Sequence, residues 1–286
     1  MPELQKEKRK IYETAGCEID FREKKGFICD MDGVIYHGNI LLPGVKEFLK
    51  WLVNEKKEYL FLTNNSGCTP KELNQKLLRM GLEVSEEHFY TSALATAAFL
   101  KEQAPGCSAY VIGEAGLFNA LYDAGITMND VNPDYVIVGE GKSYSLDTLT
   151  KASNLVLKGA KLIGANSDVS GPIEHGIAPA CKALTAPIEM ATGVQAYFCG
   201  KPNPLMMRTG LNILGCHSNE AVMVGDRMDT DVISGMESGM ATVLVLSGVT
   251  SLKSIEKYAY RPSLILNGVG EIVTYHSKQN KLKEVV

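Results

Sequence analysis

The chain has 286 residues, of which 45% are hydrophobic and 22% charged, and its formal net charge at pH 7 is −4. A chain of this length and composition can bury a large core, and two domains are slightly favoured over one. The acidic balance excludes a broad basic surface for a nucleic-acid polymer, and no apolar stretch is long enough to span a membrane as a helix. Residues 1–16 lack the apolar segment of a secretion signal.

The cysteines indicate a reducing compartment. Their number is odd and they form no C-x-x-C pair, which argues against a disulfide framework and against a zinc site. We interpret them as reduced, mostly buried thiols, and we predict a cytoplasmic protein. They are Cys17, Cys29, Cys68, Cys107, Cys181, Cys199 and Cys216.

The chain begins with a segment dense in both charges, residues 1–25, which predicts a solvated extension or a short surface helix. From Gly26 onward, short apolar runs alternate with longer amphipathic stretches. Continuous apolar strands of this kind suit a parallel sheet that helices cover on both faces. The predicted strands lie within residues 27–30, 58–65, 109–114, 134–140, 161–166, 220–226 and 241–246.

Prolines mark the start of two predicted helices, over residues 43–55 and 70–81. Alternation of strands and helices predicts an α/β fold with a doubly wound parallel sheet. Ligands of such sheets bind at the carboxyl ends of the strands. Asp30, Thr63 and Asp226 stand at the ends of three apolar runs, so we expect them to belong to one site.

The first polar segment is D-M-D-G-V, residues 30–34. Residues two apart share a side of an extended chain, so the carboxylates of Asp30 and Asp32 can face one ligand. Crowded carboxylates repel each other, and a hard divalent cation such as Mg²⁺ is their natural partner. Taken alone, the segment is equally typical of an Asp-rich turn at a strand end.

Two further segments offer phosphate ligands. Thr63 and Asn64 are the first two residues of T-N-N-S, residues 63–66. The hydroxyl and backbone N–H groups of such a segment can bind phosphate oxygens, although residues of these types also often cap helices. Lys201 stands between Gly200 and Pro202, and its compact ammonium group can neutralise a phosphoryl group. A single lysine in a loop is more often an ordinary surface residue.

The last segment is G-D-R-M-D-T-D, residues 225–231. Asp226 ends an apolar run and offers a metal ligand, while Asp231 lies one helical turn further on and can orient it. Acidic residues at a helix N-terminus are also favoured by the helix dipole, which is the structural explanation for this run.

In this order, D-x-D-G-V, T-N-N, G-K-P and G-D-x-x-x-T-D resemble the four motifs of the haloacid dehalogenase superfamily. The stretch from Asp32 to Thr63 is too short for an inserted domain, whereas the stretch from Thr63 to Lys201 is long enough for one. This arrangement is similar to subclass IIA, which carries a C2-type cap. Within it the chain resembles the NagD-like nucleotide phosphatases over residues 26–275, through residues 89–100, 130–140, 179–184 and 244–252.

The resemblance implies a division into domains: a charged extension at residues 1–25, a catalytic core at 26–84 and 199–286, and an inserted α/β cap at 85–198. It also implies a magnesium ion as the cofactor. Its expected ligands are the Asp30 side chain, the Asp32 backbone carbonyl and Asp226, with Asp231 in support.

The resemblance further implies roles in catalysis and binding. Asp30 is the expected nucleophile, Asp32 the general acid and base, and Lys201 the residue that neutralises charge. The expected substrate and phosphate ligands are Asp32, Thr63, Asn64, Lys201, Arg227, Met228, Asp229, Thr230, Asn166 and Asp168. Asn166 and Asp168 belong to a loop that is expected to select the leaving group; an ordinary strand–helix connection is the alternative.

Together these features predict a Mg²⁺-dependent phosphomonoesterase that forms a phospho-aspartate. The expected substrates are small phosphomonoesters: nucleoside 5′-monophosphates such as UMP, and generic aryl phosphates. A phosphatase of the same fold for a sugar phosphate, glycerol phosphate or phosphoglycolate is the alternative. A non-catalytic nucleotide-binding protein is disfavoured because all four motifs are intact. No nucleic acid polymer or membrane is expected as a partner, and a homo-oligomer is left open.

Overall fold

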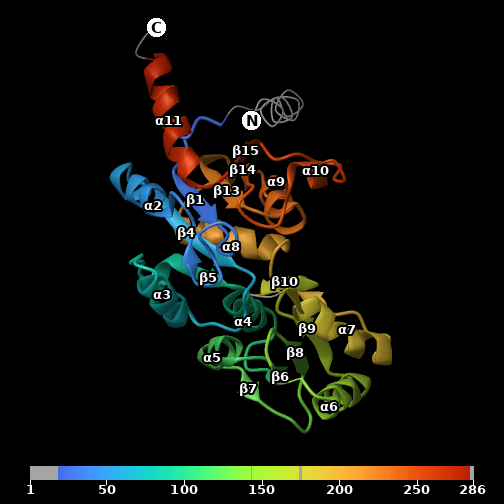
Figure 1. Ribbon diagram of the computed structural model, residues 1–286. Helices are drawn as coiled ribbons and strands as arrows, with labels where there is room; N and C mark the ends of the chain where they lie inside the picture. Colours follow the sequence, from blue (N-terminus) through green and yellow to red (C-terminus); the bar gives the residue numbers. More distant parts are fainter. Residues whose placement is uncertain (1–18, 143, 174–175, 284–286) are drawn as a thin grey trace. The chain divides into compact units, whose positions relative to one another are not determined.

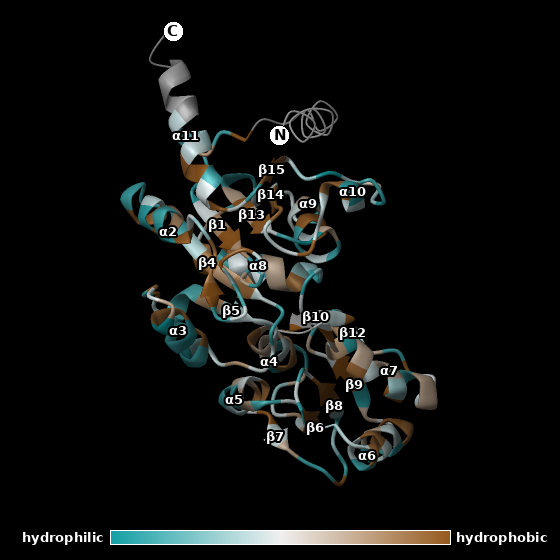
Figure 2. Ribbon diagram, in the orientation of Figure 1, coloured by the Kyte–Doolittle hydropathy of each residue, from teal (hydrophilic) through white to brown (hydrophobic). Residues whose placement is uncertain are grey.

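Apolar runs of the sequence form the strands of two parallel sheets, one in each of two structural units (Figures 1 and 2). The structure, a computed structural model, describes residues 19–142, 144–173 and 176–283. Of these, the first unit holds residues 19–62, 80–82 and 207–283, and the second holds 63–79 and 83–206. Along the described residues, no helix is both long and apolar enough to cross a bilayer.

The sheet of the first unit has the strand order β15-β14-β13-β1-β4. Its neighbouring strands pair in parallel, which confirms the predicted fold class for this part of the chain. The strands are β1 (Gly26–Cys29), β4 (Glu58–Thr63), β13 (Ala221–Gly225), β14 (Ala241–Val245) and β15 (Leu264–Leu266). β1 and β13 are buried along their whole length, as expected of a sheet covered on both faces.

Helices and short turns complete the first unit. The short antiparallel pair β2 (Tyr36–His37) and β3 (Ile40–Leu41) follows β1. The helices are α2 (Val45–Asn54), α8 (Pro204–Leu214), α9 (Ile233–Glu237), α10 (Leu252–Ile255) and α11 (Gly270–Lys283), with a 3₁₀ turn η2 (Ser218–Glu220) and a π-helical turn η3 (Met228–Val232). The turn η3 carries the last acidic motif.

The second unit has its own parallel sheet, with the order β12-β9-β8-β6-β7. Its strands are β6 (Ser108–Ile112), β7 (Thr127–Met128), β8 (Tyr135–Val138), β9 (Lys161–Gly164) and β12 (Tyr197–Phe198). The other elements are α3 (Pro70–Arg79), η1 (Glu86–His88), β5 (Phe89–Thr91), α4 (Ser92–Gln103), α5 (Ala115–Asp123), α6 (Leu146–Leu157), the hairpin β10 (Ser170–Ile173) and β11 (Gly176–Pro179), and α7 (Cys181–Thr192).

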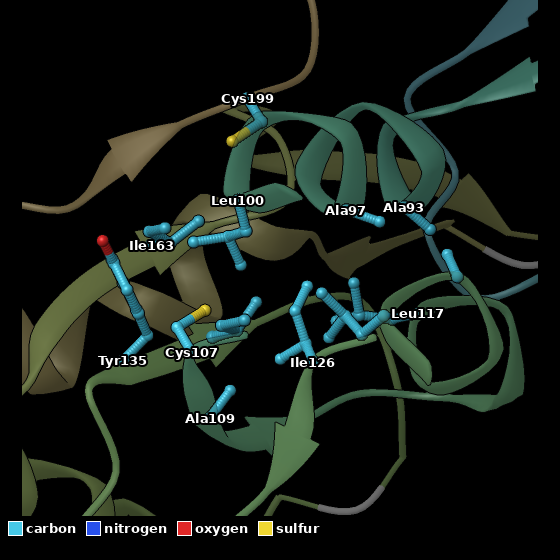
Figure 3. Close-up of a cluster of buried hydrophobic side chains, with 13 residues drawn as sticks. Ala93, Ala97, Leu100, Cys107, Ala109, Leu117, Ile126, Tyr135, Ile163 and Cys199 are labelled. Carbon is cyan, nitrogen blue, oxygen red and sulfur yellow. The ribbon is translucent and has the colours of Figure 1, made fainter. Parts of the chain in front are cut away.

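Helices cover both faces of this second sheet. Tyr135 and Ile137 of β8 join an apolar cluster with residues of α4 and α5 (Figure 3). Val136 and Val138 join a separate cluster with residues of α6 and α7. Successive side chains of a strand point to opposite faces, so one buried run supplies two cores. The second unit is therefore an α/β layer structure, as the sequence predicts for residues 85–198.

Two local expectations were wrong. The helix expected to begin at Pro43 begins at Val45, because Gly44 has φ 81° and left-handed backbone does not continue an α-helix. The expected solvated extension ends earlier than residue 25: Ile19 is 4% exposed and Phe21 is fully buried. Phe21 packs against the rings of Phe27 and Tyr275, at centroid distances of 6.0 and 5.7 Å. The rest of that segment, 1–18, lies outside the described residues.

The described cysteines agree with the expectation of reduced thiols. All six are free; Cys29, Cys107, Cys181 and Cys199 are buried, whereas Cys68 and Cys216 are partly exposed. Burial raises the pKa of the Cys29 thiol well above its usual range and that of Cys199 to about 12. These thiols stay neutral and are poor nucleophiles. Cys17 lies outside the described residues.

Candidate active site

Three buried carboxylates gather at the carboxyl end of the first sheet. Asp30 follows β1 directly and Asp226 follows β13, and these two strands are parallel neighbours. Asp231 comes from the turn η3. One carboxylate oxygen from each residue lies within 4.8 Å of those of the other two. Parallel strands end at the same sheet edge, so the topology brings together carboxylates that lie about 200 positions apart in the chain.

The donor set of this cluster fits a hard divalent cation. Asp30, Asp226 and Asp231 offer oxygen ligands only, and each is at most 8% exposed. Three buried carboxylates repel one another, and a bound cation offsets that repulsion. Mg²⁺ prefers such oxygen ligands. Asp32, in contrast, is an exposed residue and lies outside the cluster.

Backbone geometry holds Asp226 in place. Its Oδ2 accepts a hydrogen bond from the Val249 N–H at 2.6 Å, and its backbone carbonyl accepts one from the Thr250 N–H at 3.2 Å. Glycines allow this close approach, since a Cβ on Gly248 would lie 2.7 Å from the Asp226 Cβ and nearer still to its carboxylate. The loop 246–250 is therefore a backbone support for a candidate metal ligand.

We expect Gly248→Ala to weaken metal activation by about 10–100-fold, the range found when an outer support of a metal ligand is lost. The added Cβ has no space beside Asp226, so either the carboxylate or the loop must move. The measurement is the Mg²⁺ concentration that gives half-maximal activity. Gly268→Ala is the matched control, since a Cβ there meets nothing within 4 Å. Equal Mg²⁺ dependence in both variants would show that the loop does not support the ligand.

Residues 227–230 differ among themselves in exposure. The Arg227 guanidinium donates to the Asp229 carboxylate at 3.0 and 3.2 Å, and this pair is partly exposed. Met228 is fully buried and packs with Val232 and other apolar residues, while Thr230 is 5% exposed. Of the four residues expected to line the substrate site, Arg227 and Asp229 are therefore the two whose side chains solvent reaches.

The second unit brings Asn64 and Lys201 together. The Asn64 Oδ1 accepts from the Lys201 backbone N–H at 2.8 Å, and its Nδ2 donates to the Lys201 carbonyl at 3.1 Å. Both residues are buried, at 7% and 2% exposure, and so is Thr63 at 6%. A single amide side chain thus satisfies both backbone groups of the lysine. The expected phosphate-binding segment and the expected lysine are tied to each other directly.

Asn166 belongs to the same network. It is fully buried, its Nδ2 donates to the Asn64 carbonyl at 2.6 Å, and its Oδ1 accepts from the Asp168 N–H at 3.0 Å. Asp168 is partly exposed. The loop leads into the hairpin β10–β11 and reaches α7 only at Cys181. The alternative of an ordinary strand–helix connection was therefore wrong.

One member of this network was not identified from the sequence. The carboxylate of Glu140 accepts hydrogen bonds from the Ser66 N–H, the Ser66 hydroxyl and the Asn166 amide. The sequence does contain one signal for Glu140, because it is the first polar residue after the apolar strand β8, as Asp30 is after β1. The sequence singled out Asp30 because a recognisable motif surrounds it, and Glu140 has no such motif.

Comparisons with known proteins agree with the motifs. Residues 27–127 match the family model of haloacid dehalogenase-like hydrolases, and residues 198–272 match that of HAD-hydrolase-like proteins. The dihydroxyacetone phosphatase of Corynebacterium glutamicum is 46% identical over 246 residues, which cover 86% of this chain and 90% of the relative. Ribonucleotide monophosphatase NagD of Escherichia coli is 45% identical over 248 residues, covering 87% and 98%.

Solved structures show the same likeness. NagD from E. coli K-12 superposes with a TM-score of 0.82 at 44% identity, covering 87% of this chain and 98% of NagD. The 4-nitrophenylphosphatase of Thermotoga maritima superposes with a TM-score of 0.86 at 32% identity, covering 90% and 99%. The resemblance inferred from the motifs is confirmed. The chain belongs to the haloacid dehalogenase-like hydrolases, as a NagD-like phosphoric monoester hydrolase of subclass IIA.

Proposed function

We propose that the chain is a Mg²⁺-dependent phosphatase that acts through a phospho-aspartate, with nucleoside 5′-monophosphates such as UMP and generic aryl phosphates as substrates. The observation that carries the proposal is the buried cluster of Asp30, Asp226 and Asp231 at the ends of neighbouring parallel strands. Asp30 and Asp226 would hold the metal through their side chains, together with the Asp32 backbone carbonyl. Asp231, assigned a supporting role from the sequence, stands close enough to be a ligand itself.

Each step of the reaction has a residue in this chain. The Asp30 carboxylate attacks phosphorus, the bond from phosphorus to the ester oxygen breaks, and Asp32 protonates the leaving alcohol. Water, deprotonated by Asp32, then attacks the aspartyl phosphate and releases Asp30. A covalent nucleophile divides one difficult displacement into two easier ones. The metal supplies charge that offsets the repulsion between an anionic nucleophile and a phosphate dianion.

Thr63 and Asn64 are proposed to bind phosphoryl oxygens, and Lys201 to neutralise their charge. Burial supports this assignment for Lys201, because the residue is 2% exposed and is therefore not the ordinary surface lysine that the sequence alone left open. Arg227 and Asp229, the more exposed members of their loop, are proposed to line the substrate site. Residues 85–198 are proposed to be the cap, and the cytoplasmic location stays a prediction.

The substrate is tested by phosphate release from a panel of metabolites with Mg²⁺. NagD is named a ribonucleotide monophosphatase and the Thermotoga neighbour a 4-nitrophenylphosphatase, which supports the two substrate classes proposed. A small sugar phosphate is the second candidate, because the Corynebacterium relative is named a dihydroxyacetone phosphatase. A kcat/KM for a triose phosphate well above that for UMP would overturn the nucleotide proposal in favour of this second candidate.

We expect Asp168→Ala to change the ranking of substrates in this panel. Asp168 is partly exposed and follows the buried Asn166 in a loop, where residues that read substrates are often found. The expected loss is about 10-fold or more for the best natural substrate, the scale of one lost polar contact, and smaller for 4-nitrophenyl phosphate. Asp123→Ala, at the exposed end of α5, is the control. A uniform loss across the panel would show that Asp168 does not select substrates.

A further inference from the structure

We propose that Glu140 is a positioning residue, which holds Asn64 and Lys201 in place by fixing Ser66 and Asn166. This inference rests on the proposed function, in which Asn64 and Lys201 bind the phosphoryl group. Glu140 lies just after β8 in the second unit, far along the chain from all four motifs. Its role is therefore separate from the motif residues and has to be argued from its contacts.

The carboxylate of Glu140 joins two segments. One oxygen accepts from the backbone N–H of Ser66 at 3.1 Å and from the Ser66 hydroxyl. The other oxygen accepts from the Asn166 amide. The Ser66 hydroxyl in turn accepts from the Glu140 N–H at 2.9 Å. Glu140 thus binds the segment after β4 and the loop after β9 through both its side chain and its backbone.

From Asn166 the network continues to Lys201. The Asn166 amide also donates to the Asn64 carbonyl at 2.6 Å, and the Asn64 side chain pairs with both backbone groups of Lys201. Packing leaves little freedom, since a Cβ on Gly200 would lie 2.7 Å from both the Asn166 Cβ and the Asn64 Oδ1. Moving the Asn166 side chain therefore moves the support of Asn64, and with it the lysine.

The chemistry of this position calls for a carboxylate. The hydrogen bonds from the Ser66 N–H, the Ser66 hydroxyl and the Asn166 amide to the Glu140 side chain all come from donors, and an ionised carboxylate is an acceptor only. Glutamine has the same shape, but its amide group would face the donor of Asn166 or of Ser66 and break one link.

The test is Glu140→Gln with Glu114→Gln as the matched control. Glu114 is also half-buried in this unit, and its carboxylate accepts from the Lys142 N–H at 2.7 Å, outside the network of Asn64, Ser66 and Asn166. We expect Glu140→Gln to lower kcat/KM by about 10–100-fold and to raise the inhibition constant of inorganic phosphate about 10-fold, as for lost outer supports. Half-maximal Mg²⁺ should stay unchanged. Equal kinetics of the two variants would overturn the proposal.

Hydrogen exchange separates this inference from the proposed function. The Lys201 N–H is held by Asn64 Oδ1, so peptides containing Lys201 and Ser66 should exchange faster in Glu140→Gln than in wild type, while the peptide of α6 keeps its rate. This result does not depend on turnover. Wild type without phosphatase activity would overturn the proposed function alone. Unchanged exchange at both peptides would overturn the role of Glu140 alone.

Ser66→Ala carries the test if Glu140→Gln does not fold. It keeps the carboxylate with its bonds to the Ser66 N–H and the Asn166 amide, and it removes the two hydrogen bonds that the Ser66 hydroxyl forms with Glu140. A smaller rise in the phosphate inhibition constant, about 3–5-fold, is expected if each lost bond contributes about 0.5 kcal/mol. Where both variants fold, the double variant should lose less than the product of the two single losses, because the residues act through one contact. Strictly multiplicative losses would contradict a shared role.

Discussion

Replacing Asp30 by Asn should abolish turnover, with a loss in kcat on the order of 10⁴ or more, as for other lost nucleophiles. The amide has no anionic oxygen with which to attack phosphorus, although it fits the same space. Asp30 is 8% exposed at the end of β1, where a same-size substitution should leave the fold intact. The control is Asp123→Asn on the exposed surface. Activity of Asp30→Asn within tenfold of wild type would remove Asp30 from the mechanism.

The same substitution should stabilise the metal-free protein. Oxygens of Asp30, Asp226 and Asp231 lie within 4.8 Å of one another, so removing one negative charge relieves repulsion. A gain of about 1 kcal/mol corresponds to a rise in Tm of roughly 2–4 °C for a domain of this size. A loss of kcat together with a rise in the metal-free Tm distinguishes a lost nucleophile from a damaged fold, which would lower both. A fall in metal-free Tm would count against the carboxylate cluster as described.

Removing divalent metal should abolish activity, and Mg²⁺ should restore it. Without a cation, the buried carboxylates of Asp30 and Asp226 would face a phosphate dianion with no compensating charge. Ca²⁺ should restore activity poorly, because its coordination shell is larger and looser. Initial rates after metal stripping, followed by titration with each ion, are the measurement.

Thermal stability gives the metal prediction a readout that needs no substrate. Saturating Mg²⁺ at about 100 times its Kd stabilises by roughly 2.7 kcal/mol, so Tm should rise by several degrees in wild type. Asp226→Asn should abolish this rise, because it removes one of the three clustered carboxylates. Full activity in excess chelator, or an equal rise in Asp226→Asn, would show that the ion binds elsewhere.

Local sequence patterns predicted the candidate site residues that stand at the ends of strands. Asp30 and Asp226 follow apolar runs, and the parallel pairing of β1 and β13 brings them to one sheet edge. The motif order assigned Asn64 and Lys201 to phosphate binding, and the structure shows in addition that two hydrogen bonds join them. Strand position and side-chain type are enough for such residues, because both are local in sequence.

Other features depend on tertiary contacts that no local pattern contains. Burial of Phe21 comes from packing against Tyr275 at the other end of the chain, while its neighbours in sequence are charged. The support of Asp226 by the Val249 N–H is a backbone contact, and backbone contacts leave little trace in side-chain patterns. Glu140 resembles many polar residues that follow strands, and only its bonds to Ser66 and Asn166 distinguish it.

Asp30 should carry the phosphoryl group during turnover, and trapping the phospho-enzyme tests this directly. Protein with Mg²⁺ is mixed with 4-nitrophenyl phosphate, quenched in acid within the first turnover, digested and analysed by mass spectrometry. We predict a phosphorylated peptide whose modified residue is Asp30, which is lost on treatment with hydroxylamine and absent from Asp30→Asn. Release of nitrophenol in the first turnover without phosphorylated Asp30, or with the phosphoryl group on another residue, would contradict the mechanism.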